Sequence, residues 1–223
     1  MTRPREFDER AVVDAAMQAF WSGGLASTSV GELLQATGLS RSSMYQCIGN
    51  RDTLLELAVT RYVDEQVAAI ERAFAGQRLD QAFARILDDA ALDNFAGRGC
   101  LLANGVNELH ARDADRLAVV QAGFARIAEA LRAAIARAAP RRGDPAQRCV
   151  ELMAAIAGLR TLQRAGIDVP LRQLAAQHFA AALARPRAPA SSPAAGALGP
   201  AEGPVKAGGG RARSRGARTT PRG

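Results

Sequence analysis

The sequence has few aromatic residues and no long apolar run, and both absences limit what the protein can be. Phe, Tyr and Trp make up 4% of the 223 residues, so the apolar 48% consists mainly of Ala, Leu and Val. Ala and Leu favour helices, whereas strands favour β-branched and aromatic side chains. No apolar stretch reaches the ~18 residues of a membrane-spanning helix, and the first residues lack the apolar core of a signal peptide. We therefore expect a cytoplasmic, all-α protein.

Cysteine and histidine are also scarce. The three cysteines, Cys47, Cys100 and Cys149, form no Cys-x-x-Cys pair, and His110 and His178 lie far apart in the sequence. This set does not fit a disulfide framework and has no metal-ligand spacing. The sequence also lacks a Walker lysine motif, a His-Glu-x-x-His motif and a Gly-x-Ser-x-Gly motif. We expect no metal, no cofactor and no enzymatic activity.

The net charge of +7 is confined to one end of the chain. Residues 1–184 contain 21 Arg and 21 acidic residues, whereas residues 185–223 contain seven Arg and Lys206 against Glu202. The same last segment holds six of the ten prolines and eight of the 21 glycines. Such a composition cannot bury enough apolar surface to fold, so we predict a disordered tail over 185–223. Its arginines either add non-specific attraction to phosphates or are simply solvated.

Helical periodicity dominates the rest of the chain. Val12, Ala16 and Phe20 recur on one face of a helix, and Ser29 with Glu32 has the pattern of a capping box. Glycines and prolines separate the periodic segments. A first helix is predicted to end at Gly23-Gly24, and a short second helix after Ser29 to end at Gly38. Further helices are predicted over residues 41–48, 52–74, 79–95, 99–111, 114–139, 145–165 and 168–184.

Two of the short helices, separated by residues 36–40 with Gly38 in the turn, have the pattern of a helix-turn-helix motif. In the second of them the spacing predicts an inward face and an outward face. The inward face consists of Met44, Cys47 and Ile48, and the outward face of Arg41, Ser42, Tyr45 and Gln46. Arg and Gln suit the edges of guanine and adenine, while hydroxyls suit phosphates. The pattern alone leaves two interpretations open, a DNA-recognition helix or a plain helical bundle with a polar surface.

Three runs at fixed spacing favour the first interpretation. They are DAAMQAFWSGGLASTSV over 14–30, LLQATGLSRSSMY over 33–45 and GNRDTL over 49–54. Together they resemble the DNA-binding domain of the tetracycline-repressor (TetR) family. The resemblance implies a helix-turn-helix domain over 1–53 and a helical effector-binding and dimerisation domain over 54–184. It also implies a homodimeric, ligand-responsive regulator, a repressor that binds a pseudo-palindromic DNA operator.

Carried over by position, the resemblance assigns roles to individual residues. Arg41 and Ser42 would contact bases, and Gln46 would lie at the groove or the backbone. The residues implied to hold phosphates are Thr28, Ser29, Ser43, Tyr45 and Arg51. Leu25 and Ile48 depart from the family pattern, which has aromatic residues at both positions. An alternative is therefore a dimeric helical ligand-binding or thiol-sensing adaptor that no longer binds DNA specifically.

The remaining expectations concern residues 54–184. We expect an effector pocket between the central helices, with candidate lining residues Phe83, Asn94, Phe95, Asn104, Asn107, His110 and Phe124. The apolar helices over 145–184 would form the homodimer interface, or else an internal core. Cys100 begins a predicted helix, and its segment resembles that of regulators which sense electrophiles through cysteine. It is either a redox-sensitive thiol or a packing residue, whereas Cys47 and Cys149 are expected to be buried.

Overall fold

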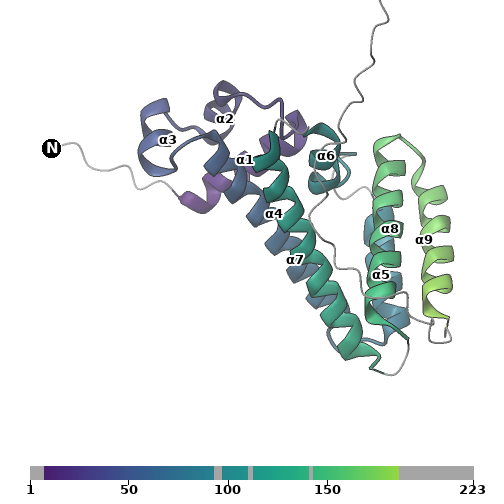
Figure 1. Ribbon diagram of the computed structural model, residues 1–223. Helices are drawn as coiled ribbons and strands as arrows, with labels where there is room; N and C mark the ends of the chain where they lie inside the picture. The colour runs from purple at the N-terminus through teal and green to yellow at the C-terminus, as the bar shows by residue number, and fades with distance from the viewer. Residues whose placement is uncertain (1–7, 93–96, 110–112, 141–142, 186–223) are drawn as a thin grey trace, which may run out of the picture. The chain divides into compact units, whose positions relative to one another are not determined.

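A computed structural model describes residues 8–92, 97–109, 113–140 and 143–185, and these belong to one compact unit of the chain. The predicted tail lies outside the described residues. Figure 1 shows the helices: α1 (Glu9–Gly23), α2 (Val30–Thr37), α3 (Arg41–Cys47), α4 (Arg51–Phe74), α5 (Leu79–Ala91), α6 (Leu101–Glu108), α7 (Ala114–Ala138), α8 (Pro145–Arg164) and α9 (Val169–Ala184). The described residues contain no strand. The prediction of an all-α fold is confirmed.

Local capping signals determine where the N-terminal helices begin. Asp8, Ser40 and Asn50 each accept backbone N–H groups of the helix that follows them and so fix the starts of α1, α3 and α4. The N-cap predicted at Ser40 is confirmed. The capping box predicted at Ser29 is present, with Glu32 bonded back to the Ser29 backbone. Gly38 ends α2 with φ +69°, a left-handed conformation that favours glycine, and so permits the turn into α3.

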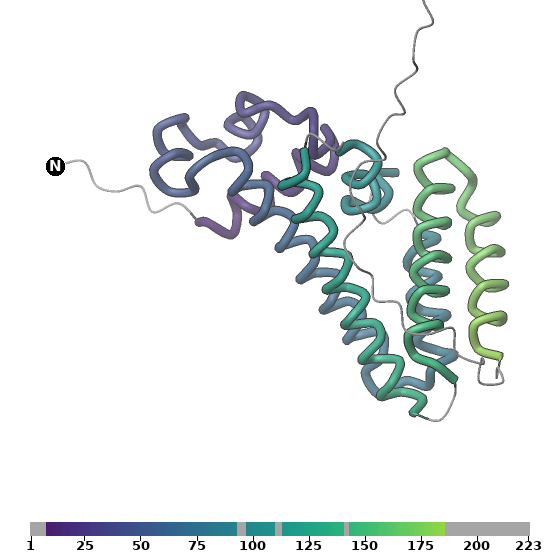
Figure 2. The backbone as a smooth tube through the Cα atoms, viewed as in Figure 1, coloured from purple at the N-terminus to yellow at the C-terminus, as the bar shows by residue number. Residues whose placement is uncertain are grey.

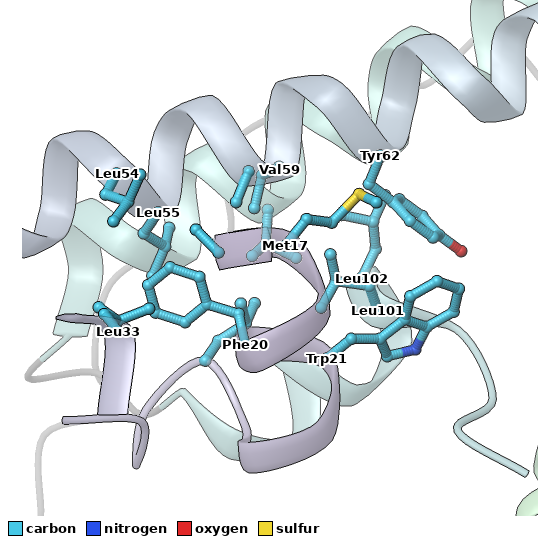
Figure 3. Close-up of a cluster of buried hydrophobic side chains, with 14 of the residues drawn as sticks. Met17, Phe20, Trp21, Leu33, Leu54, Leu55, Val59, Tyr62, Leu101 and Leu102 are labelled. Carbon is cyan, nitrogen blue, oxygen red and sulfur yellow. The ribbon is translucent and has the colours of Figure 1, made fainter. Parts of the chain in front are cut away.

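One hydrophobic core joins α1 and α2 to the long helices. Figure 3 shows Phe20 on α1 pointing toward Leu33 of α2 and Leu55 of α4, with Leu101 and Leu102 of α6 close by. All five side chains are almost completely buried. Helix α4 also runs through the predicted domain boundary at residue 53 without a break. The N-terminal helices therefore share their core with α4 and α6.

A second core lies among α5, α7, α8 and α9. Figures 1 and 2 show α4 and α7 running side by side from the first core toward the second, with α5, α8 and α9 grouped beside them. The second core consists mainly of Ile70, Leu79, Phe83, Leu87, Leu131, Ile135, Leu152, Leu159 and Leu183. Cys149 belongs to it, as predicted, and burial raises the pKa of its thiol. None of the described helices has the length and apolar character needed to cross a membrane.

The prediction that Cys47 faces inward is wrong, because its side chain is exposed. Helix α3 is held by Met44, which is completely buried, and by Ile48 directly after the helix. On a helix, Cys47 points about 80° away from the middle of that pair. A short helix packed through two residues leaves this edge uncovered. The two departures from the family pattern, Leu25 and Ile48, are both buried in the first core.

Candidate nucleic-acid interface and effector cavities

Helix α3 presents the polar face that the sequence predicts. The side chains of Arg41, Ser42 and Gln46 are exposed, and that of Tyr45 is 51% exposed. Ser43 is half-buried, and its hydroxyl lies 2.8 Å from that of Ser40 at the N-cap. The buried Met44 anchors the opposite side of the helix. An Arg, a Gln and several hydroxyl groups therefore project together from one short, anchored helix.

The two hydroxyl residues before α2 have different surroundings. The side chain of Ser29 is exposed and exchanges hydrogen bonds with Glu32. The pKa of the Glu32 carboxyl is lowered, mainly by the hydrogen bond from the Ser29 backbone and then by the one from the Ser29 side chain. Thr28 is only 3% exposed, and its hydroxyl donates to the carbonyl of Gly24 at 2.7 Å. Its predicted phosphate contact does not fit this burial. We revise the role of Thr28 to a bond that shapes the turn before α2.

Arg51 also differs from its predicted role. Its Nε donates to the Thr28 carbonyl at 2.8 Å and its Nη2 to the Leu25 carbonyl at 2.6 Å. The guanidinium lies 5.2 Å from the centre of the Phe20 ring, and the side chain is only 14% exposed. Burial, followed by the nearby charge of Arg116, lowers the pKa of Arg51. Arg51 therefore ties the start of α4 to the turn between α1 and α2, and it is a positioning residue.

Helices α4 and α7 are linked at their N-terminal ends. Arg116 on α7 donates from Nε to the Asp52 carboxylate at 2.8 Å and reaches Asp113 at 3.4 Å. The hydrogen bond from Arg116 is the largest cause that lowers the pKa of Asp52. Because Asp52 follows Arg51, this ion pair connects α7 to the same corner of the N-terminal domain.

The larger of two described cavities has a volume of about 640 Å³ and lies between α4, α5, α7 and α8. Its apolar lining comes mainly from Ile70, Phe124, Ile127, Leu131, Met153 and Ile156. Tyr62, Cys100 and Arg160 contribute polar groups to one wall. Charged side chains also border it, among them Arg10, Arg61, Asp64, Glu65, Arg72 and Asp89. A cavity of this volume is in the size range of sites for small organic ligands.

The smaller cavity has a volume of about 390 Å³ and lies between α6 and the C-terminal half of α8. It is more polar, with Asn104, Asn107, Glu108, Thr161 and Arg164 in its lining. The two cavities adjoin, because Cys100, Ala103, Ala157 and Arg160 border both.

The predicted pocket residues are distributed unevenly. Asn104 and Asn107 line the smaller cavity and Phe124 lines the larger one, whereas Asn94, Phe95 and His110 lie outside the described residues. Phe83 lines neither cavity. It is completely buried in the second core, where its ring meets that of Phe74 edge to face at 6.3 Å between centroids. Phe83 is therefore a core residue that borders neither of these two cavities.

Two polar residues of the larger cavity, Tyr62 and Arg160, were not predicted from the sequence. The Tyr62 hydroxyl donates to the Cys100 sulfur at 3.4 Å, and burial raises the pKa of this phenol well above its ordinary value. Burial lowers the pKa of Arg160 on α8. Tyr62 and Arg160 are far apart in sequence, and no local pattern marks either of them. Within the described part of the chain, no group of three or more potential metal ligands is assembled.

Helices α8 and α9 have an apolar face that the rest of the protomer does not cover. Leu152, Leu159 and Leu183 are buried in the second core. Large apolar side chains on the same two helices and the turn between them stay exposed: Val150 at 65%, Leu162 at 38%, Ile167 at 38%, Leu171 at 58%, Leu174 at 51% and Phe179 at 41%. The apolar residues predicted over 145–184 are therefore divided between the core and an exposed surface.

Comparisons with known proteins agree with this architecture. No family model matches the chain. The chain is 29% identical over 120 residues to the HTH-type transcriptional repressor ComR of Escherichia coli K12, and this covers 48% of the chain and 53% of ComR. It is 30% identical over 112 residues to the HTH-type regulator YezE of Bacillus subtilis 168, with 48% and 58% covered. The chain thus spans about half the length of the curated relatives it matches.

Solved structures show the fold. A cysteine mutant of the TetR-family regulator CifR in complex with double-strand operator DNA matches with a TM-score of 0.73 at 18% identity, covering 81% of this chain and 99% of CifR. A TetR-family regulator of Agrobacterium tumefaciens matches at 0.65 and 20%, covering 78% and 95%. Reduced E. coli NemR matches at 0.63 and 14%, covering 76% and 94%. The chain has the fold of TetR-family transcriptional regulators.

Proposed function

We propose that this protein is a ligand-responsive, TetR-type transcriptional repressor of the cytoplasm that binds a pseudo-palindromic operator. The observation that carries the proposal is the exposed polar face of α3 within this fold. Arg41, Ser42 and Gln46 would contact base edges in the major groove, where Arg and Gln make bidentate contacts to guanine and adenine. Ser29, Ser43 and Tyr45 would contact phosphates that set the register.

A homodimer accounts for the exposed apolar face of α8 and α9. Two copies of this face would cover Leu171, Leu174 and Phe179 in an isologous four-helix interface. The dimer axis would place two α3 helices about 34–36 Å apart, one turn of B-DNA, so that each enters a major groove on the same side of the duplex.

The larger cavity is the proposed effector site. An effector that favours a conformation in which the two α3 helices no longer match the groove spacing would release the operator. Operator and effector binding are then negatively coupled, and each weakens the other by the same factor.

Selection of bound duplexes from a random DNA pool by the purified full-length protein tests this function. We expect recovery of an inverted repeat whose half-sites lie about one helical turn apart. A variant that ends at residue 185 should recover the same repeat, with a weaker dependence of affinity on salt because fewer phosphates are neutralised. Recovery of no consensus by either protein would contradict the proposal and leave the alternative of a ligand-binding adaptor.

A further inference from the structure

Two consecutive residues of α4 belong both to the wall of the larger cavity and to the contact with α1. Arg61 and Tyr62 border the cavity, and so does Arg10 near the start of α1. The Arg61 Nε donates to the Asp14 carboxylate on α1 at 2.6 Å. The Tyr62 ring meets the Trp21 ring on α1 edge to face, with 5.1 Å between the centroids. One turn of α4 therefore lies between the cavity and α1.

The ring contact is the buried part of this junction. Trp21 and Tyr62 are each 4% exposed, and Figure 3 shows their side chains next to each other between α1 and α4. The Tyr62 hydroxyl donates to the sulfur of Cys100, which also borders the cavity. Because protein interiors are closely packed, a displacement of the Tyr62 ring displaces the Trp21 ring as well.

The ion pair on the neighbouring residue supports the ring contact. Arg61 joins Asp14 of α1 to Glu65 of α4, which its Nη2 reaches at 2.9 Å. All three side chains are partly exposed, so these charge pairs are weaker than buried ones would be. Arg61 therefore orients α1 on α4, while the two rings make the close contact.

Helix α1 is in turn packed against the helix-turn-helix motif. Phe20, which precedes Trp21, is completely buried and points toward Leu33 of α2 (Figure 3). Helix α2 leads through the turn at Gly38 into α3. A movement of α1 therefore carries α2 and α3 with it, because the side chains between them leave no space for independent movement.

We propose that Arg61 and Tyr62 are positioning residues that couple the larger cavity to α1. A ligand in the cavity displaces the Tyr62 ring, Trp21 follows, and α1 shifts on α4 together with α2 and α3. The role of the ligand as an effector rests on the proposed function. The shift of α1 can be measured without DNA.

Trp21 is the only tryptophan of the chain, so its emission reports on this junction. Octan-1-ol is a suitable probe, because it is apolar, uncharged and does not absorb where tryptophan does. In the DNA-free, full-length protein we expect calorimetric binding of octan-1-ol and a change in Trp21 emission with the same midpoint. Ala69→Phe, which fills the larger cavity, should abolish both. No binding, or binding without a change in emission, would overturn the proposal.

Substitutions on α4 test the two residues through the coupling factor, which is the ratio of operator affinities without and with octan-1-ol. We expect about fivefold or more in the parent and a value near one in Tyr62→Leu. Tyr62→Phe keeps the ring and should keep the factor, while Arg61→Gln should lower it in part. Arg126→Gln is the matched control, because it breaks an ion pair of 2.6 Å between Asp64 on α4 and α7 instead of α1.

Calorimetry and circular-dichroism melting check that each variant still binds octan-1-ol and folds. Equal coupling factors in the parent and in Tyr62→Leu would overturn the proposal. Should Tyr62→Leu fail to fold, an unchanged factor in Arg61→Gln would overturn it instead. Failure to select any operator would contradict the proposed function, while the Trp21 emission would still decide the link to α1. Release of the operator by octan-1-ol with unchanged Trp21 emission would keep the proposed function and overturn this link.

Discussion

Arg41 and Arg51 carry the same charge near the two ends of the recognition region, but their surroundings differ. Arg41 is exposed at the start of α3. Arg51 is mostly buried and donates to the backbone carbonyls of Leu25, Ala26 and Thr28. Substitution of each residue should therefore affect a different property.

Arg41→Ala should weaken specific operator binding by about 1–3 kcal/mol and relax the preference at one base pair, because the loss removes a base contact. Electrophoretic mobility shifts on the selected operator and on its single-base variants measure both effects. The free energy of unfolding should change little, since the side chain is exposed. An operator preference identical to that of the parent would remove Arg41 from the base-contacting residues.

Arg51→Ala should instead lower the free energy of unfolding by about 1–3 kcal/mol, because it leaves three carbonyl groups in the turn before α2 without this donor. Urea denaturation measures this change. Arg72→Ala, at an exposed position of the same helix, is the control and should stay within about 0.5 kcal/mol of the parent. A fully stable Arg51→Ala protein with a reduced salt dependence of DNA binding would restore the predicted phosphate contact.

At the scale of elements, α6 connects the smaller cavity to the N-terminal domain. The Glu108 carboxylate accepts the backbone N–H of Leu25 at 2.7 Å, and Glu108 also borders the smaller cavity. A side chain at Gly105 would overlap that of Leu25, so α6 packs closely on the turn between α1 and α2. A ligand that moves α6 would therefore move this turn.

Glu108→Gln should reduce the coupling between effector and operator. An amide oxygen still accepts the Leu25 N–H, so that the fold is kept, but the charge-assisted bond is lost. Coupling between two sites is commonly about 5–150-fold in affinity, and we expect this factor to fall toward one. Operator affinity measured with and without a small molecule that binds in the larger cavity gives the factor. An unchanged factor would show that α6 transmits nothing through Glu108.

The ion pair between α4 and α7 should make stability depend on pH in the acid range. The pKa of Asp52 lies below its ordinary value of 3.8, chiefly because Arg116 donates to the carboxylate. A group with a lowered pKa in the folded state contributes stability above its unfolded pKa and loses it as the pH falls through the lowered value. Asp52 therefore stabilises the fold at neutral pH and ceases to do so in strong acid.

Asp52→Asn tests this dependence. Its urea midpoint should lie below that of the parent at neutral pH, and the two midpoints should converge below pH 3.8. The difference should be small and should shrink with added salt, because Asp52 is half exposed. A gap that stays constant over the whole pH range would show that the substitution acts through something other than this ion pair.

At the scale of the whole molecule, dimerisation should depend on the exposed apolar face. The double variant Leu171→Glu, Leu174→Glu should be monomeric by sedimentation and should lose most of its operator affinity, because a single α3 contacts only one half-site. Its helix content should be unchanged, since both side chains are exposed in the protomer. Val106→Glu, at an exposed apolar position on α6, should remain dimeric. A dimeric double variant would place the interface elsewhere.

Local signals in the sequence were enough to predict the helices and the outward face of α3. Asp8, Ser29, Ser40 and Asn50 act on backbone groups within a few residues, so their effect can be seen in the sequence. The spacing of Arg41, Ser42, Tyr45 and Gln46 around the buried Met44 likewise follows from helix geometry. No contact from another part of the chain is needed for either prediction.

The predictions that differ from the structure concern residues whose surroundings come from distant segments. Thr28 and Arg51 have the chemistry of phosphate contacts, but the turn between α1 and α2 brings carbonyl groups to both. Phe83 is buried because α9 and α8 cover α5, and Cys47 is exposed because no helix covers its edge of α3. Periodicity shows which residues share a helix face, whereas the packing of other helices decides which faces are covered.

The sequence by itself thus determined an all-α fold, the approximate extent of the helices and the polar face of α3, because these depend on interactions between near neighbours. The helices predicted over 79–95 and 99–111 are shorter in the structure, at Leu79–Ala91 and Leu101–Glu108. Only the tertiary structure decided that Cys100 and Arg160 meet at the wall between two cavities with Tyr62 bonded to Cys100, and that α6 reaches Leu25 through Glu108. These groups come from segments that are far apart in the chain. Their proximity results from the burial of two shared cores, which no local pattern describes.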